Sequence, residues 1–186
     1  QSQFGPIEVA PGFWIVPSWS QAPDPGALVL RLDPGLAFGT GSHPTTRMCL
    51  QWLQANVARG DALLDYGCGS GILAIAAAKL GAQRVVGVDI DPQSLRASAD
   101  NARANGVDVA IAAPEALPEG TFDIVVANIL TNPLIVLAPA IATRVRVGGR
   151  LALTGILEEQ AHSVAAAYAP WFTLAPWRVC EGWVLL

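Results

Sequence analysis

The sequence predicts an α/β fold built on a mostly parallel sheet with helices on both faces. Short apolar runs alternate with helix-length segments from residue 62 onward, as expected for strands joined by right-handed helical crossovers. The run 62–66 leads directly into three alternate glycines, and the run 84–88 ends at Asp89. The two final apolar runs are so close in sequence that they favour an antiparallel end to the sheet.

The N-terminal part of the chain differs from the rest. Apolar segments 13–17 and 28–32 predict two short strands, separated by a turn rich in proline and glycine. A glycine-rich loop follows, and Pro44 then suits the first turn of a helix. We therefore divide the chain into a linker with short strands, residues 1–35, and one larger domain, residues 36–186.

The remaining elements follow from the alternation, the capping residues and the glycine stops. The first helix is predicted to begin after Ser42 or His43 and to end at Gly60, and the pair 148–149 is predicted to turn tightly into a strand. The seven expected strands of the sheet are 62–66, 84–88, 108–112, 122–127, 150–155, 172–179 and 182–186. The further expected helices are 71–80, 92–105, 133–145 and 157–169.

Composition narrows the class of partner. Charged residues make up 14% of the 186 residues, the net charge is −4, and Lys79 is the only lysine. Direct binding of nucleic acid is disfavoured because neutralising phosphates needs a basic face. A basic protein or a cationic small molecule suits this charge better.

The cysteines and one long uncharged run have ordinary explanations. Cys49, Cys68 and Cys180 lack metal-ligand spacing and fit small buried thiols in a reducing cytoplasm, so no metal is expected. Residues 124–143 carry no charge over a length that could span a bilayer, but polar residues and two prolines interrupt the run. We therefore expect no membrane segment.

The glycine run and the acid that follows it predict a nucleotide site. Gly67, Gly69 and Gly71 would let the backbone approach a ligand where any Cβ would collide, although a tight turn alone could also require glycine. Asp89 would lie at the carboxyl end of the neighbouring strand, where one carboxylate can accept from both ribose hydroxyls. The other interpretation of Asp89 is a cap for the helix beginning at Pro92.

The identity of the nucleotide depends on Asp65. The string from Gly69 to Ala74 also fits the dinucleotide pattern G-x-G-x-x-G/A, so a nicotinamide cofactor stays open. A carboxylate at position 65 would face a pyrophosphate with like charge, whereas it would suit the ammonium of an amino-acid moiety. It could also simply order the loop. The run D-x-G-x-G-x-G resembles the first motif of S-adenosylmethionine (SAM) methyltransferases.

Three separated blocks extend this resemblance. They are Leu32–Thr46, with its unusual sequence LDPGLAFGTGSHPTT, the glycine block Asp65–Ala74, and Val126–Pro133, which reads VANILTNP. Together they resemble the ribosomal protein L11 methyltransferase family over nearly the whole chain. The resemblance implies a Rossmann-like class I SAM-dependent methyltransferase fold, and an enzyme that methylates lysine side chains and the α-amine of ribosomal protein L11. We also expect a monomer acting in the cytoplasm.

The same resemblance assigns residues. Carried over position by position, the cofactor contacts are Thr46, Gly67, Asp89 and Asn128. The family has an N-terminal substrate-recognition domain, which we expect this chain to lack. Other open interpretations are a SAM enzyme for another protein lysine or a small amine, a nicotinamide-dependent oxidoreductase, and a binding module without activity.

Asn128 is the candidate catalytic residue. It follows a predicted strand at the edge of the sheet where ligands bind, and its side-chain oxygen could accept a hydrogen bond from a target amine. It could contact the cofactor, the substrate or both, or it could only order the loop before Pro133. Thr46 could equally satisfy backbone donors in a first helical turn. Phe38 could cover the cofactor or fill a hydrophobic gap.

Overall fold

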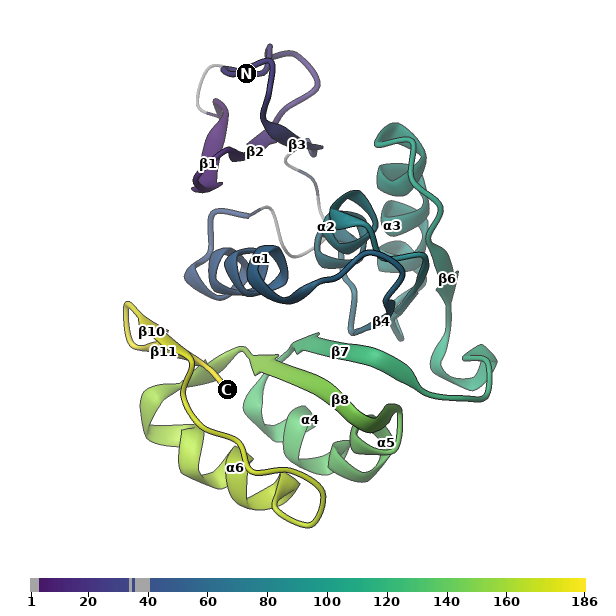
Figure 1. Cartoon of the computed structure of the whole chain (residues 1–186), viewed down its shortest axis with the longest axis vertical. Helices are drawn as coiled ribbons and strands as arrows, with labels where there is room; N and C mark the ends of the chain where they lie inside the picture. The colour runs from purple at the N-terminus through teal and green to yellow at the C-terminus, as the bar shows by residue number, and fades with distance from the viewer. Residues whose placement is uncertain (1–3, 34, 36–40) are drawn as a thin grey trace.

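The computed structural model describes residues 4–33, 35 and 41–186. A central sheet is covered on one face by helices α1 to α3 and on the other by α4 to α6 (Figure 1). A small N-terminal sheet lies beyond α1 and α2. Within the described ranges, none of the helices has the length and apolar character needed to cross a bilayer.

The central sheet has five parallel strands in the order β6-β5-β4-β7-β8. The order places β4 in the centre, and β4 and β5 end side by side, with Tyr66 opposite Val88. The five strands are β4 Ala62–Tyr66, β5 Arg84–Val88, β6 Ala110–Ala112, β7 Phe122–Asn128 and β8 Val145–Thr154.

The helices alternate with these strands, as the sequence predicts. Two 3-10 turns, η1 Pro114–Ala116 and η2 Glu158–Gln160, accompany them. The helices are α1 Pro44–Asn56, α2 Ile72–Leu80, α3 Pro92–Ala104, α4 Thr131–Val136, α5 Ala138–Ala142 and α6 Ala161–Tyr168. The predicted start of α1 is confirmed, because His43 accepts the Thr45 N–H as its N-cap.

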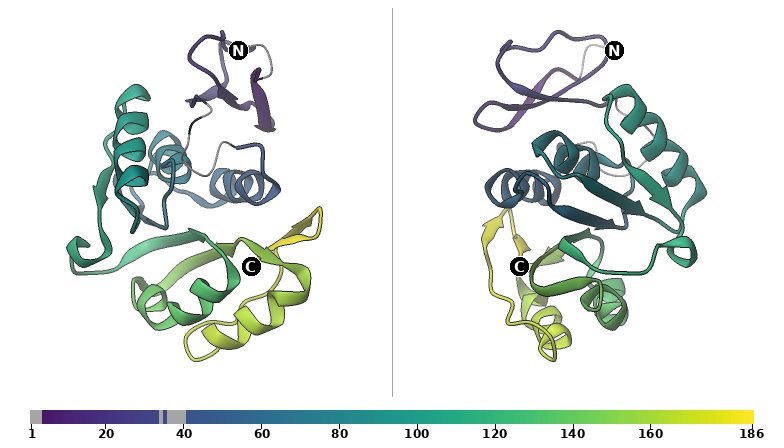
Figure 2. Two further views of the ribbon diagram at one scale, coloured as in Figure 1. Left: turned by 180° about the vertical axis from the view of Figure 1, so that it is seen from behind. Right: turned by 45° about the vertical axis from the view of Figure 1, so that its right-hand side comes forward.

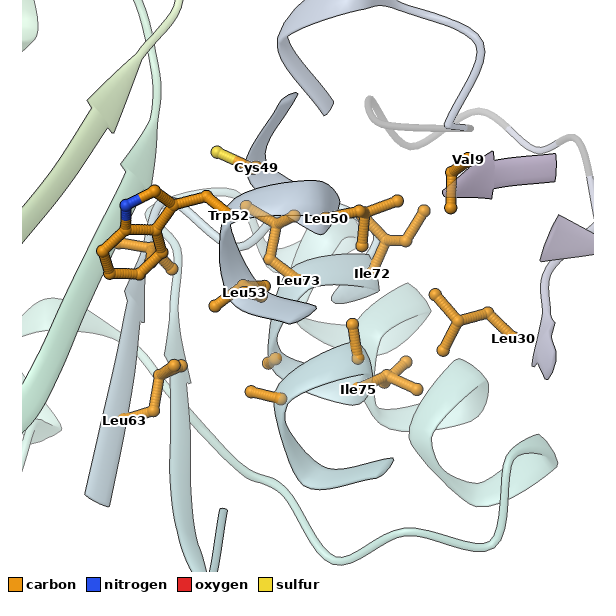
Figure 3. Packing of buried hydrophobic residues seen from close by; sticks show 14 of the residues in the cluster. Val9, Leu30, Cys49, Leu50, Trp52, Leu53, Leu63, Ile72, Leu73 and Ile75 are labelled. Carbon is orange, nitrogen blue, oxygen red and sulfur yellow. The ribbon is translucent and has the colours of Figure 1, made fainter. Parts of the chain in front are cut away.

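The sheet divides the hydrophobic core into two clusters. One joins α1 and α2 to the N-terminal strands, and Figure 3 shows Leu30 and Val9 facing Leu50, Ile72 and Ile75 across that contact. The other cluster fills the opposite face, where α4, α5 and α6 pack on the sheet. Because both faces are covered, the central strands carry apolar residues on both sides rather than in alternation, with Asp65 as a buried polar residue at the end of β4.

The N-terminal strands form a sheet of their own. It comprises β1 Ile7–Ala10, β2 Phe13–Val16 and β3 Leu28–Arg31, so the two predicted strands are confirmed and β1 is added. Figure 2 shows this sheet set apart from the central one, on the side of α1 and α2. Two hydrogen bonds between Arg31 and Asn105, at the end of α3, fix it there.

The single helix predicted over 133–145 is wrong. The structure has two short helices, α4 and α5, which meet at Leu137. Pro139 has no N–H to donate to the carbonyl of Ile135, and its ring would collide with that carbonyl in a continuous helix. The backbone therefore breaks two residues before the proline.

The turn predicted at Gly148 and Gly149 does not begin the strand. β8 starts at Val145, and the paired residues jump from Phe122–Val145 to Ile124–Arg150. The glycines form a bulge inside the strand, where Gly148 has a φ of +76°.

The C-terminal strands do not all join one seven-stranded sheet. The structure has a separate antiparallel sheet in the order β10-β11-β9, formed by β9 Ile156–Leu157, β10 Arg178–Cys180 and β11 Trp183–Leu185. The chain end still meets the central sheet antiparallel, because Leu153 and Leu186 exchange two backbone hydrogen bonds. The predicted helix 157–169 is shorter, because residues 156–157 pair with β11 and residues 158–160 form the 3-10 turn η2 before α6 begins.

Candidate active site

A cavity of about 480 Å³ opens at the carboxyl ends of the parallel strands. Six of the seven predicted site residues line it: Thr46, Asp65, Gly67, Gly69, Asp89 and Asn128. They come from α1, β4, the loop after β4, the end of β5 and the end of β7. The fold thus brings together residues that are as many as 82 positions apart, as expected for ligand sites in open α/β sheets.

Gly71 is the predicted site residue that does not line the cavity. It begins α2 with a φ of +81°, and a Cβ there would lie 3.0 Å from the Ser98 hydroxyl on α3. Its lack of a side chain therefore lets α2 and α3 pack closely. A cofactor contact at Gly71 stays a prediction without support from the cavity.

Gly67 and Gly69, unlike Gly71, line the cavity. Both have positive φ, +82° and +54°, so the turn geometry itself favours glycine. The Gly67 and Cys68 N–H groups both donate to the Val88 carbonyl, which ties the loop to the end of β5. Gly67 and Gly69 therefore fit both interpretations: the turn favours glycine at these positions, and both residues line the cavity that a ligand would enter.

Asp89 holds this loop while it faces the cavity. Its two carboxylate oxygens accept from the Gly69 N–H and the Asp91 N–H, each at 2.9 Å. Asp91, not Asp89, caps α3 by accepting from Gln93 and Ser94. Since each carboxylate oxygen can accept more than one hydrogen bond, Asp89 retains capacity for ligand hydroxyls.

Asp65 is a buried carboxylate at the end of β4. Its side chain is 1% exposed, and Oδ2 accepts from the Ala74 N–H of α2 at 3.2 Å. Oδ1 has no hydrogen-bond partner within the described ranges. Burial, with a smaller contribution from the nearby Asp89 charge, raises the pKa of this carboxyl to about 7, although the Ala74 hydrogen bond acts in the opposite direction. A cationic or donor group in the cavity would satisfy the free oxygen.

Asn128 and Thr46 lie side by side in the cavity wall. The Asn128 amide nitrogen donates to the Thr46 hydroxyl at 3.4 Å, from the end of β7 to the first turn of α1. This contact leaves the amide oxygen as the acceptor that Asn128 offers to a ligand. Phe38, the candidate cover over the cofactor, lies outside the described residues.

The sequence did not single out the far wall of the cavity. Trp183 of β11 lines it, with its ring centroid 4.9 Å from that of His43 in an edge-on arrangement. Tryptophan has no local pattern that signals a site, and only the C-terminal hairpin brings it there. The His43 ring nitrogen Nδ1 contacts both the backbone N–H and the hydroxyl of Thr45, so that nitrogen is committed to the helix start.

The rim is apolar and exposed in two places. Ile90, next to Asp89, is 86% exposed, and Leu130, two residues after Asn128, is 68% exposed. Both line the cavity, and Pro133 and Leu137 of the α4 region continue the apolar surface beyond Leu130. One end of the cavity thus has acidic groups and glycines, and the other is apolar with one amide.

This arrangement suits a nucleoside with a cationic amino-acid tail at the acidic end and a second, uncharged group at the apolar end. A parallel sheet with this helix arrangement, a glycine loop after its central strand and an acid ending the next strand define a class I SAM-dependent methyltransferase fold. A solved ribosomal protein L11 methylase from Lactobacillus delbrueckii subsp. bulgaricus shares it, with a TM-score of 0.87 and 34% identity over 98% of this chain and 96% of that one.

The chain belongs to the ribosomal protein L11 methyltransferase (PrmA) family, which it matches over residues 1–186. Curated relatives of that name from Cupriavidus metallidurans and Thiobacillus denitrificans are 61% and 63% identical over all 186 residues. The chain spans only 61% and 63% of their respective lengths. The chain is also similar to a solved T. thermophilus 16S rRNA N2 G1207 methyltransferase in complex with AdoMet and guanosine. The sequence identity is 28% and the TM-score 0.67, over 80% of this chain and 44% of that one.

Proposed function

We propose that this chain is the catalytic part of a SAM-dependent N-methyltransferase that acts on amino groups of ribosomal protein L11. The family assignment supports this activity, and the single structural observation that carries it is the unpartnered, buried Oδ1 of Asp65 beside Asp89. A buried carboxylate oxygen without a donor is costly, so a cationic ligand is expected at this point.

The residues present fit SAM. Asp65 would hold the ammonium of its methionine part, and Asp89 would accept from the ribose hydroxyls at the end of β5. The Gly67–Gly69 loop would lie against the nucleoside. When bound, SAM supplies an electrophilic methyl group on a positively charged sulfur.

The chain's own residues would orient the acceptor. The Asn128 amide oxygen would accept a hydrogen bond from the target amine and thereby direct the nitrogen lone pair, with Thr46 fixing the amide. Leu130, Pro133 and Trp183 provide an apolar surface for an alkyl chain. Desolvation there lowers the pKa of a lysine ammonium and favours the neutral, nucleophilic form. The ammonium loses its proton to water before transfer, so the reaction needs no dedicated protein base.

The nicotinamide alternative is disfavoured by the same residue. A pyrophosphate would bring negative charge toward Asp65, whose carboxylate is already buried and close to Asp89. The net charge of −4 and the proposed protein acceptor argue against direct nucleic-acid binding. A ribosomal protein substrate corresponds to action in the cytoplasm, and we propose that the protein acts there as a monomer. Within this chain, we propose residues 36–186 as the catalytic unit and residues 1–35 as a linker.

Calorimetry with SAM and with NAD(H) tests the cofactor. We expect SAM to bind and NAD(H) not to bind. Incubation with labelled SAM and ribosomal protein L11, read by intact mass, tests the reaction, and a series of added methyl groups on L11 is expected. NAD(H) binding without SAM binding would contradict the proposal. Methylation of a free lysine analogue but not of L11 would favour a different acceptor.

A further inference from the structure

The connection between β7 and α4 is short and has one inward-facing residue. β7 ends at Asn128 and α4 begins at Thr131, so only Ile129 and Leu130 lie between them. The Leu130 side chain is 68% exposed, whereas the Ile129 side chain is half-buried and packs on the core beneath α4 to α6. β7 pairing with β8 holds the Asn128 backbone, and the contacts of Ile129 decide how the chain leaves the strand directly after it.

Two glycines from other strands hold Ile129. A Cβ added at Gly67, after β4, would lie 2.4 Å from the Ile129 Cγ2 methyl, so that methyl occupies the space above the glycine. A Cβ added at Gly155, after β8, would lie 2.0 Å from the Ile129 carbonyl oxygen and 2.7 Å from its carbonyl carbon. A real Cβ makes no contact as short as these, so Ile129 leaves no room for a side chain at either glycine, in addition to the positive φ of +82° and +89° that favours glycine there.

These contacts constrain different parts of the residue. Gly67 receives the β-branch methyl of the side chain, and Gly155 receives the backbone carbonyl, so both the side chain and the peptide plane are fixed. The Asn128 backbone pairs with Thr154 of β8, whereas its side-chain amide makes a long 3.4 Å bond to Thr46. The contacts of Ile129 fix the peptide that follows Asn128. All three contributing strand ends, β4, β7 and β8, border the same cavity.

We propose that Ile129 is a positioning residue: clamped between Gly67 and Gly155, it sets where the Asn128 amide presents its oxygen to the acceptor amine. This inference rests on the proposed function for its catalytic consequence, but the clamp itself is a property of the chain alone. The Gly67 contact also couples the acceptor side of the cavity to the loop proposed to hold the cofactor.

Two substitutions at one position separate clamping from simple packing. Ile129→Val keeps the β-branch methyl that lies on Gly67, whereas Ile129→Leu keeps the side-chain volume and moves the branch one carbon outward. If the clamp matters, turnover falls on the order of 10- to 100-fold in the Leu variant, with SAM affinity nearly unchanged, and stays near wild type in the Val variant. A residue that only fills volume would tolerate Leu at least as well as Val.

A ligand-free measurement makes the test independent of activity. We expect the NMR signals of the Asn128 side-chain amide to shift and broaden in the Leu variant and to match wild type in the Val variant. Gly155→Ala should disturb the same signals, since it displaces the Ile129 carbonyl. Gly12→Ala is its control, because Gly12 also has positive φ, +70°, but an added Cβ there meets nothing within 4 Å.

The outcomes separate the two proposals. Equal Asn128 signals in the Val and Leu variants would overturn the clamp, whether or not the chain is active. Equal turnover in an active chain would likewise overturn the positioning role. Failure of the wild-type chain to bind SAM would refute the proposed function, while the ligand-free comparison would still decide whether Ile129 positions Asn128.

Discussion

Asp65→Asn is expected to stabilise the ligand-free chain above neutral pH while weakening its cofactor site. Burial raises the pKa of the Asp65 carboxyl from 3.8 to about 7. The folded chain thus keeps a proton that the unfolded chain has lost, so the free energy of unfolding falls as pH rises between those two values. About three pKa units correspond to about 4 kcal/mol in total.

The amide variant lacks this titration. Its oxygen can accept from the Ala74 N–H, as Oδ2 of Asp65 does in the wild-type chain at 3.2 Å. The free energy of unfolding can be measured with denaturant at about pH 5 and about pH 8. The difference between the variant and the wild-type chain should move in favour of the variant by about 3 kcal/mol from the lower to the higher pH. Asp108→Asn, at an exposed position, is the matched control.

The same variant should bind SAM on the order of 10- to 100-fold more weakly, because an amide offers an ammonium no charge. Wild-type affinity should also decline as pH falls below about 7, where Asp65 becomes protonated. An unchanged stability difference between Asp65→Asn and wild type at the two pH values would refute the argument, since it would mean that the buried carboxyl does not titrate there.

Three further predictions concern single carboxylates and the amide. Asp89→Ala should weaken SAM binding by about 100-fold, because two charge-assisted hydrogen bonds to the ribose are lost. Calorimetry measures the affinity and circular dichroism verifies the fold, and an unchanged affinity would contradict the ribose assignment. Asn128→Ala should reduce kcat far more than SAM affinity, and the reverse order in steady-state and binding measurements would assign it to the cofactor. Hydrogen bonds from Ala62 N–H and Arg146 hold the pKa of Asp123 below its usual value. Its stabilisation should therefore be complete above about pH 4 and lost below it, whereas the melting temperature of Asp123→Asn should fall less on acidification.

Local patterns were sufficient for most of the sheet and for the acidic end of the cavity. The bounds of β4 and β5 were predicted to the residue, because apolar runs ending in glycine or acid have few alternatives. Asp65, Gly67, Gly69 and Asp89 lie where strand ends must meet in a parallel sheet. The apolar periodicity of residues 133–145 continues across Pro139 and therefore predicts one helix, whereas the proline divides it into α4 and α5.

The sequence by itself determined the parallel α/β fold, the glycine loop and the acids that frame it, since each follows from neighbouring residues along the chain. Only the tertiary structure decided which glycines face the cavity, since Gly71 packs on Ser98 whereas Gly67 and Gly155 enclose Ile129. It also brought Trp183 to the cavity wall. These roles depend on contacts between distant strands, and a missing Cβ leaves no local signal of what fills its place.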